Sequence, residues 1–337
     1  MSHEPLPAVR VPRGRIGLVG LGAVGARVAR QLAPAVGPLP VSELRPGLTA
    51  ALGRDLPLAA VTPDELDLVD LVVLAHPAPH LALAERFLRR GVHVVSTSDD
   101  LADVTELLEL DDLAAAHGAC LVVGAASSPG LSGLIAAELA SRLDSVDELH
   151  VAVHGTGGPS CARQHHRILG GTALGWHDGQ WLRRAGGSGR ELCWFPEPIG
   201  GRDCYRAELV DPIVLLRAFP DVVRISARVS ATRRDRLTAR LPMLTPPHSE
   251  GGIGGLRVEV RGYAGEARRT EVAGAAERAA VTTAAVAATM AAFVVDGCAG
   301  AGPGVVCLGE QRLPQRELLD DVRARGIDVM EFAEPEQ

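Results

Sequence analysis

A glycine-rich turn near residue 20 constrains the possible folds of this chain more than any other feature. Residues 16–19 are apolar and predict a short strand, and an amphipathic helix is predicted after the turn. Between them, Gly20, Gly22 and Gly25 have the G-x-G-x-x-G spacing of a dinucleotide-binding unit, in the strand–turn–helix context that the motif requires. The alternative interpretation is a glycine-rich turn that holds no ligand.

Each position of this motif has a physical role in holding a pyrophosphate. Gly20 permits a tight turn, Gly22 lets the backbone approach the phosphates, and Gly25 lets the helix pack closely on the strand. The first turn of the helix presents free N–H groups and the positive end of the helix dipole to the phosphates. We therefore expect the backbone of this turn, including Ala23 and Val24, to bind the cofactor.

Glu43 is the candidate for recognition of the adenosine ribose. Residues 39–43 predict a second strand, and Glu43 stands at its carboxyl end, 23 positions beyond Gly20. A carboxylate there accepts hydrogen bonds from the ribose hydroxyls and repels a 2′-phosphate, so we expect NAD(H) to be favoured over NADP(H). Two alternatives stay open: Glu43 is only a solvated residue at the strand end, or Arg45 pairs with a 2′-phosphate.

Strands and helices alternate up to about residue 124. Apolar strands are predicted at 70–75, 92–95 and 120–124, with helices at 81–90 and 103–117. Continuously apolar strands are typical of a parallel sheet that is buried on both faces. The pattern predicts an α/β fold, with a doubly wound parallel Rossmann sheet in a dinucleotide-binding domain of residues 1–130.

Three loops follow the carboxyl ends of predicted strands, which is where ligands bind in such sheets. They cover residues 76–80, 96–99 and 127–130. Ser128 in the third loop is expected to contact the substrate. Besides the glycine turn, Glu43 and Arg45, the residues expected at the cofactor are Ala75, His76, Pro77, Ser96, Thr97, Ser98, Pro129 and Gly130.

The composition excludes several other classes of function. A net charge of −7 argues against nucleic acid or an anionic membrane as the partner. The chain contains no lysine, which excludes Schiff-base chemistry, attachment of pyridoxal phosphate and a Walker A lysine. A transferred proton must then come from His, Asp, Glu, Tyr, Cys or water.

The targeting and cysteine patterns favour a cytoplasmic protein. Residues 1–13 are polar and lack the features of a secretory signal, and no two cysteines form a C-x-x-C pair. The longest apolar run, residues 279–295, is too short and too rich in alanine and threonine for a membrane span. We expect it to form a buried helix.

The order of several motifs resembles that of a known family. Gly91–Ser98 (GVHVVSTS) precedes a helix and the segment 118–124, and Ser128–Ser132 (SPGLS) follows. These segments are similar to the "GvHyvdts" strand end and the "PGlsn" helix start of the saccharopine dehydrogenase-like (saccharopine reductase-type) oxidoreductases. The resemblance runs from about residue 15 to about residue 309.

This resemblance implies an NAD(P)-binding domain, an α+β substrate domain and hydride transfer at a carbon–nitrogen bond of an amino-acid-like small molecule. The usual Tyr and Asp of the strand end correspond here to Val94 and Ser96. The family also includes members that reduce carbon–carbon double bonds and members with no assigned reaction. A sensor that binds a dinucleotide without catalysis and a reductase of C=C bonds are therefore the alternative functions.

The second part of the chain predicts an α+β domain. We expect residues 131–275 to bind substrate and to contribute the dimer contact, with residues 276–337 returning to complete the first domain. Residues 256–263 alternate in hydropathy, and a return strand follows a turn. Such a sheet often forms an intersubunit face, so the expected assembly is a homodimer.

A second glycine-rich loop, residues 155–160, is predicted to open a helix that runs to residue 170. Free N–H groups at its start can hold a substrate carboxylate, with Ser160 at the loop end. Arg163 and Arg167, one helical turn apart, can add bidentate contacts. The alternative is a flexible turn with solvated arginines.

Two histidines are the candidates for catalysis. His76 follows a buried strand at its carboxyl end, where the nicotinamide is expected, and histidine exchanges protons near neutral pH. Its alternative role is to cap the loop. His165 is expected to donate a hydrogen bond to the substrate or to complete the pocket beside Arg163. We expect no metal site, because adjacent histidines on a helix, such as His165 and His166, point about a hundred degrees apart.

Overall fold

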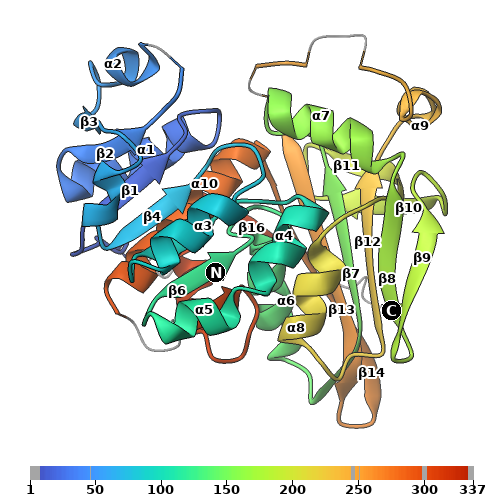
Figure 1. Cartoon of the computed structure of the whole chain (residues 1–337). Coiled ribbons are helices and arrows are strands. Elements are labelled where there is room, and N and C mark those ends of the chain that lie inside the picture. The colour runs from blue at the N-terminus through green and yellow to red at the C-terminus, as the bar shows by residue number, and fades with distance from the viewer. Residues whose placement is uncertain (1–7, 46, 244–246, 250, 298–301, 333–337) are drawn as a thin grey trace. The chain divides into compact units, whose positions relative to one another are not determined.

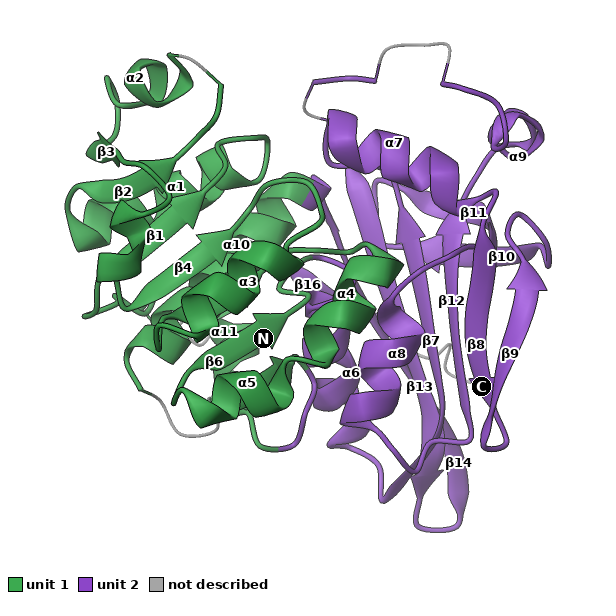
Figure 2. Ribbon diagram, viewed as in Figure 1, with its two compact units in different colours: residues 1–126, 280–308, 312–327 green, residues 127–279, 309–311, 328–337 purple. Residues whose placement is uncertain are grey.

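The computed structural model describes residues 8–45, 47–243, 247–249, 251–297 and 302–332. The chain divides into two compact units (Figure 2). Unit 1 contains residues 1–126, 280–308 and 312–327, and unit 2 contains residues 127–279, 309–311 and 328–337. The first part of the polar stretch 1–13 and the end of the segment 276–337 lie outside the described residues.

Unit 1 is built on a parallel sheet of seven strands in the order β15-β6-β5-β4-β1-β2-β3. The strands are β1 (Ile16–Val19), β2 (Leu39–Ser42), β3 (Leu58–Ala60), β4 (Leu71–Leu74), β5 (His93–Ser96), β6 (Cys120–Val123) and β15 (Gly304–Cys307). β1 pairs with both β2 and β4, so the strand order reverses at β1. This is the topological switch point of a Rossmann sheet, and the predicted doubly wound α/β fold is confirmed.

Helices cover both faces of this sheet, with α3 and α5 in front of it and α10 behind it in Figure 1. The helices of unit 1 are α1 (Gly25–Val36), α2 (Leu48–Leu52), α3 (Leu81–Leu88), α4 (Leu101–Leu108), α5 (Asp111–Ala116), α10 (Ala279–Val295) and α11 (Gln315–Ala324). All four residues of β4, β6 and β15 are buried, as expected for strands covered on both faces.

The apolar run 279–295 forms α10, which is buried along nearly its whole length, as predicted. Its alanines and threonines let neighbouring elements approach closely. The hydroxyl of Thr289 donates to Asp321 at 2.7 Å, which joins α10 to α11. Among the described residues, none of the helices is long and apolar enough to cross a membrane.

Unit 2 is built on a mixed sheet of nine strands. Its main path is β10-β11-β12-β7-β13-β14-β16, and the hairpin of β8 and β9 joins it through β12. The strands are β7 (Ser145–His154), β8 (Thr172–His177), β9 (Gln180–Ala185), β10 (Glu191–Phe195), β11 (Gly200–Arg206), β12 (Arg224–Ser230), β13 (Gly254–Ala264), β14 (Ala267–Glu277) and β16 (Val329–Glu331). The helices are α6 (Leu131–Ala140), α7 (Pro159–Ile168), α8 (Asp211–Ala218) and α9 (Arg233–Thr238).

Strand β12 shows how the two faces of this sheet differ. Ile225, Ala227 and Val229 alternate with polar residues and are all buried. Val229 packs with Ile168 at the end of α7, so this face is covered by helix. The other face of β12 carries arginine and serine side chains, as the period of two along a strand requires.

The C-terminal segment is shared between the two units. α10, β15 and α11 belong to unit 1, whereas β16 pairs with β14 in the sheet of unit 2. The physical reason is that β14 has a free edge, which β16 covers through pairs such as Ala275 with Val329. Arg142 and Glu331 add an ion pair at 2.5 Å. Residues 328–332 thus extend the second sheet and do not complete the first unit.

Candidate functional site

The glycine turn of unit 1 has the geometry that the motif predicts. Gly20 has a φ of 92°, and its N–H donates to the carbonyl of Ser42 at 2.9 Å. A Cβ at Gly25 would collide with the carbonyl oxygen of Gly20, so a larger residue cannot stand there without moving the turn. A Cβ at Gly22 would meet no atom within 4 Å. The space beside Gly22 is therefore open for a ligand.

The start of α1 offers donors to such a ligand. Among the described residues, Ala26 is the first residue of the helix with a backbone acceptor, the carbonyl of Gly22 at 3.0 Å. The amides of Ala23 and Val24 precede it and take no backbone acceptor there. Free amides at the start of a twelve-residue helix, together with the open space at Gly22, fit a pyrophosphate.

Glu43 lies beside this turn, and its side chain is only 6% exposed. Its carboxylate accepts the amide N–H of Leu21 at 2.6 Å and pairs with Arg45, whose Nη2 lies 2.8 Å from Oε2. The hydrogen bonds from Arg45, with that from Leu21, lower the pKa of Glu43 to about 2 despite its burial. The charge of Arg45 is thus compensated by Glu43 and is not held free for a 2′-phosphate.

His76 follows β4, and the backbone before it is held by the sheet, because the amide of Ala75 donates to Val19 at 2.9 Å. Nδ1 of His76 lies 2.7 Å from the carbonyl oxygen of Pro77. A carbonyl only accepts, so Nδ1 carries the proton and Nε2 is left as an acceptor. Nε2 is buried and has no hydrogen-bond partner within the described residues.

His80, which sequence reasoning did not select, lies behind His76. It is fully buried, its ring centre is 4.3 Å from that of His76, and its Nε2 donates to the carbonyl of His76 at 2.8 Å. Nδ1 of His80 accepts from the hydroxyl of Ser96 at 2.8 Å. Burial, together with the neighbouring His76, lowers the pKa of His80 to about 4, so it is neutral at pH 7.

The loop after β5 is held by the same network. The hydroxyl of Ser96 also accepts the amide of Ser98 at 3.2 Å, and the hydroxyl of Thr97 donates to Leu74 at 3.0 Å. Asp103, buried at the start of α4, accepts the amide of His80 at 2.8 Å. The structure therefore brings the loops after β4 and β5 together. The sequence signal for this proximity is that neighbouring parallel strands end at the same edge of the sheet.

The loop at residues 127–130 belongs to unit 2. The hydroxyl groups of Ser128 and Ser132 each donate to Asp211 at 2.6 Å. Asp211 is fully buried, and burial raises its pKa above the ordinary value. Ser128 is therefore engaged with a buried carboxyl group that sequence reasoning missed. Pro129 and Gly130 follow, and Gly130 precedes α6 with a φ of 128°.

The predicted helix after the second glycine loop is α7. Arg163 is exposed and its Nη2 lies 3.3 Å from the hydroxyl of Ser160, and Arg167 is exposed as well. Desolvation lowers the pKa of His165, and hydrogen bonds to the backbone of Ser230 and Gly155 partly offset this. His165 thus contacts the backbone at the end of β12 and in the glycine-rich loop before α7.

Next to this segment, His154 accepts or donates a hydrogen bond at 2.7 Å to the hydroxyl of Ser230. His150 makes the equivalent contact to Ser226 at 2.8 Å. These pairs follow from the parallel pairing of β7 with β12. Within the described residues, the structure contains no group of three or more His, Cys, Asp or Glu side chains that could hold a metal ion.

Comparison with known proteins identifies the fold. No family model matches the chain, and no curated protein matches it. Among solved structures, it resembles apo saccharopine dehydrogenase (L-Glu forming) from Saccharomyces cerevisiae with a TM-score of 0.70 and 14% identity, over 95% of this chain and 100% of that one.

Two further structures are less similar. An amine dehydrogenase from Mycobacterium smegmatis has a TM-score of 0.51 and 16% identity, over 90% of this chain and 97% of that one. An engineered D-amino acid dehydrogenase has a TM-score of 0.50 and 16% identity, over 93% of this chain and 100% of that one. With its Rossmann sheet, glycine turn and mixed second sheet, the chain has the fold of the saccharopine dehydrogenase-like proteins.

Proposed function

We propose that this chain is an NAD(P)-dependent oxidoreductase that transfers a hydride at a carbon–nitrogen bond of an amino-acid-like small molecule. The observation that carries the proposal is the turn at Gly20–Gly25, with open space at Gly22 and Glu43 beside it, at the switch point of the parallel sheet. The three proteins compared above, described as a saccharopine dehydrogenase, an amine dehydrogenase and a D-amino acid dehydrogenase, support the substrate class.

The chain's own residues have distinct tasks in this proposal. The amides of Ala23 and Val24 bind the pyrophosphate, and Glu43 accepts hydrogen bonds from the ribose. When bound, a nicotinamide dinucleotide supplies a hydride donor or acceptor. His76 is proposed to accept a hydrogen bond or a proton at Nε2; the support is that this atom is buried and lacks a partner in the described residues.

Other predicted contacts are proposals of the same kind. In unit 1, Ala75, Pro77, Ser96, Thr97 and Ser98 stand in the loops after β4 and β5 and are proposed to line the cofactor. In unit 2, we assign Pro129 and Gly130 to the cofactor. Ser128, Ser160, Arg163, Arg167 and His165 are assigned to the substrate, with the arginines binding its carboxylate.

The preference for NAD(H) is part of the proposal. Glu43 is ionised at neutral pH and pairs with Arg45, so the preference requires that the carboxylate and not the guanidinium faces the ribose, where it disfavours a 2′-phosphate. We expect calorimetry to show that the wild type binds NADH more tightly than NADPH. Glu43→Ser should lower the ratio of the Kd for NADPH to the Kd for NADH. Glu85→Ser, which removes a different Arg-paired glutamate in unit 1, is the matched control. Tighter NADPH binding by the wild type would refute the preference.

A sensor without catalysis is the second candidate, and the position of Ser96 favours it. Ser96 stands where the family has an aspartate, and its hydroxyl is engaged with the buried His80. A screen of amines, amino acids, keto acids and unsaturated acids separates the candidate functions. The measurement is the change in NADH absorbance with each compound. Turnover of an amine or keto acid supports the proposal, turnover of only the unsaturated acids indicates a C=C reductase, and NADH binding without turnover supports the sensor.

A further inference from the structure

A small pocket lies on the sheet of unit 2, where β12 changes partner. Along one edge of β12, residues 224–226 pair with β8 and residues 228–230 pair with β11. The two partner strands separate beside Ala227. The opening between them forms a pocket of about 120 Å³.

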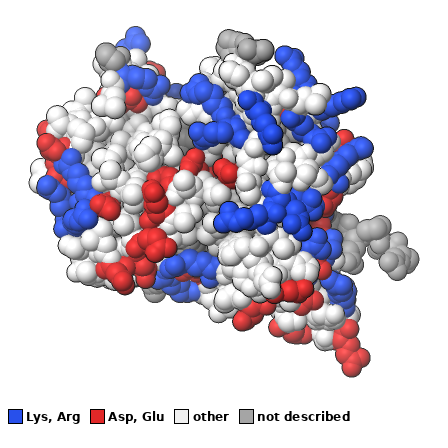
Figure 3. All heavy atoms as spheres, turned by 45° about the vertical axis from the view of Figure 1, so that its right-hand side comes forward, with Lys and Arg blue, Asp and Glu red and all other residues white. Residues whose placement is uncertain are grey.

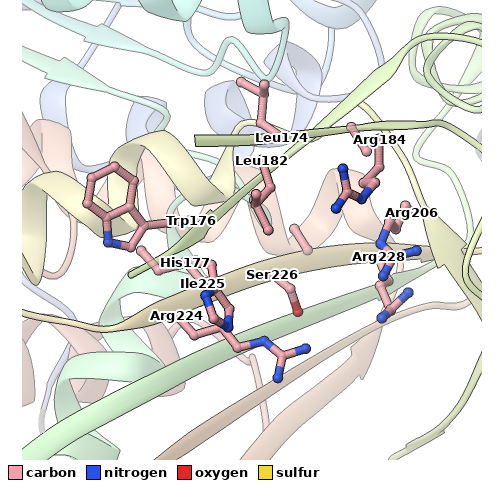
Figure 4. Close-up of a pocket in the computed structure, with 13 residues that line it drawn as sticks. Leu174, Trp176, His177, Leu182, Arg184, Arg206, Arg224, Ile225, Ser226 and Arg228 are labelled. Carbon is pink, nitrogen blue, oxygen red and sulfur yellow. The ribbon is translucent and has the colours of Figure 1, made fainter. Parts of the chain in front are cut away.

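Four arginines line this pocket, which we call the arginine pocket: Arg184, Arg206, Arg224 and Arg228 (Figure 4). They come from β9, β11 and β12, and the last of these strands contributes two. In Figure 4 the side chains of Arg184, Arg206 and Arg228 gather at one side of the opening, beside Leu182 and Ser226. Figure 3 shows that arginine side chains, drawn in blue, also cluster on the surface of the molecule.

The positive charge of the pocket is poorly compensated. Arg228 is 8% exposed, and its Nε lies 2.7 Å from Glu191. Arg224 is 3.7 Å from Glu148, but that carboxylate also binds Arg268 at 2.7 Å. Within the described residues, the carboxylate that acts on the guanidinium of Arg206 is that of Glu191, which already pairs with Arg228. One exposed glutamate and one shared glutamate thus face four cations.

Arg206 also stands directly opposite Arg228 in the antiparallel ladder of β11 and β12. Like charges in this position destabilise a sheet. Burial and the charges of Arg228, Arg184 and Arg224 lower the pKa of Arg206 from its ordinary value. The backbone at Gly189 closes over the same guanidinium, because a side chain there would collide with it. The pairing of β11 with β12 therefore keeps the two guanidinium groups close together despite their repulsion.

We infer that the arginine pocket binds a dianionic phosphate group, either free phosphate or the phosphate of a small phosphorylated molecule. Guanidinium groups bind phosphate oxygens through paired N–H donors, and a dianion compensates the excess charge better than a monoanion does. The pocket has room for one such group. This inference is independent of the dehydrogenase proposal, since all of its residues lie in unit 2.

The test is calorimetric titration of the full-length protein with inorganic phosphate and with glycerol 3-phosphate, in buffers of matched ionic strength. We expect saturable binding with one site per chain, weakened about tenfold or more in Arg206→Gln and in Arg184→Gln. Arg183→Gln is the matched control, since Arg183 is exposed, adjacent to Arg184 and on the other face of β9. We expect its affinity to stay within about twofold of wild type.

Thermal unfolding gives a second readout that a purely structural arginine would not produce. In chloride buffer, Arg206→Gln should have a Tm equal to or above that of the wild type, because repulsion from Arg228 is relieved. Phosphate should raise the Tm of the wild type and of Arg183→Gln, but raise that of Arg206→Gln much less. Arg184 is exposed, so Arg184→Gln tests the site even where Arg206→Gln fails to fold.

Several results would overturn the inference. If Arg183→Gln weakens phosphate binding as much as Arg206→Gln does, or if all variants bind phosphate equally, the binding is nonspecific. A change of oligomeric state in Arg206→Gln by sedimentation, with no saturable phosphate binding in the wild type, would assign these arginines to contact with a second copy of the chain. Tighter binding of glycerol 3-phosphate than of phosphate supports a phosphorylated molecule as the ligand, and equal binding supports free phosphate.

Discussion

The glycine turn of unit 1 and the arginine pocket of unit 2 offer an anion different groups. The turn offers backbone amides, which carry no net charge and are held by the fold whether or not a ligand is present. The pocket offers four guanidinium groups that repel one another. An amide site therefore costs little stability when it is empty, whereas an arginine site raises the free energy of the folded state until an anion binds.

A second comparison concerns two neighbouring histidines of unit 1. His80 in unit 1 is buried, neutral and fully hydrogen-bonded, whereas His76 beside it retains one buried acceptor without a partner in the described residues. Buried polar atoms without partners cost about 1–3 kcal/mol. His80 therefore holds the loop, and we propose His76 as the residue that contacts a ligand.

The largest expected effect sharpens that distinction. His76→Ala should lower kcat for the substrate found by the screen by about 10²–10⁴-fold, which is the usual loss when a general acid or base is removed. The Kd for NADH, measured by calorimetry, should stay near the wild-type value. His117→Ala is the control, because His117 is exposed and its Nδ1 also bonds a backbone carbonyl. If His76→Ala keeps the full kcat across the pH range, His76 has no catalytic role and is only a residue of the loop.

The second prediction concerns acid stability and Glu43. Its pKa of about 2 in the folded protein lies below the ordinary 4.5, so its stabilising contribution is complete above pH 4.5 and is lost as the pH falls towards 2. Because Arg45 is largely exposed and solvent screens the pair, the contribution is about 1–2 kcal/mol. Urea unfolding from pH 7 to pH 2 should show a smaller loss of stability in Glu43→Gln than in the wild type. Parallel curves for the two proteins would show that the pairing with Arg45 and Leu21 contributes nothing.

The third prediction separates two glycines of one turn. Gly25→Ala should destabilise unit 1 by about 1–3 kcal/mol and abolish NADH binding, because the new methyl group collides with the carbonyl of Gly20. Gly22→Ala should leave the Tm nearly unchanged, since its methyl group would meet no atom, yet weaken NADH binding. Thermal unfolding and calorimetry measure both. Unchanged NADH affinity in Gly22→Ala would mean that no ligand approaches this position.

The smallest expected effect belongs to the start of α7 in unit 2. Arg163 is exposed, so its pairing with a substrate carboxylate is worth about 1 kcal/mol. Arg163→Ala should raise KM for an acidic substrate about fivefold with little change in kcat. Arg269→Ala, another exposed arginine of unit 2, is the control. An equal change in both variants would indicate general electrostatic attraction in place of a specific contact.

Much of unit 1 was predictable because its signals are local. The glycine spacing, the continuously apolar strands and the apolar run 279–295 each act through neighbouring residues, and each predicted its element correctly. The position of Glu43 at the end of β2 also followed from the sequence, but its bond to the amide of Leu21 required the structure. The contact of Glu43 with a ribose stays a prediction.

The sequence by itself determined the class of the fold and the glycine turn, because strand hydropathy and backbone freedom at glycine depend on residues close together in the chain. Only the tertiary structure decided that Ser96 bonds His80, that Ser128 bonds Asp211 and that Arg206 stands opposite Arg228. Strand order and register place these partners together, and both depend on the packing of the whole sheet.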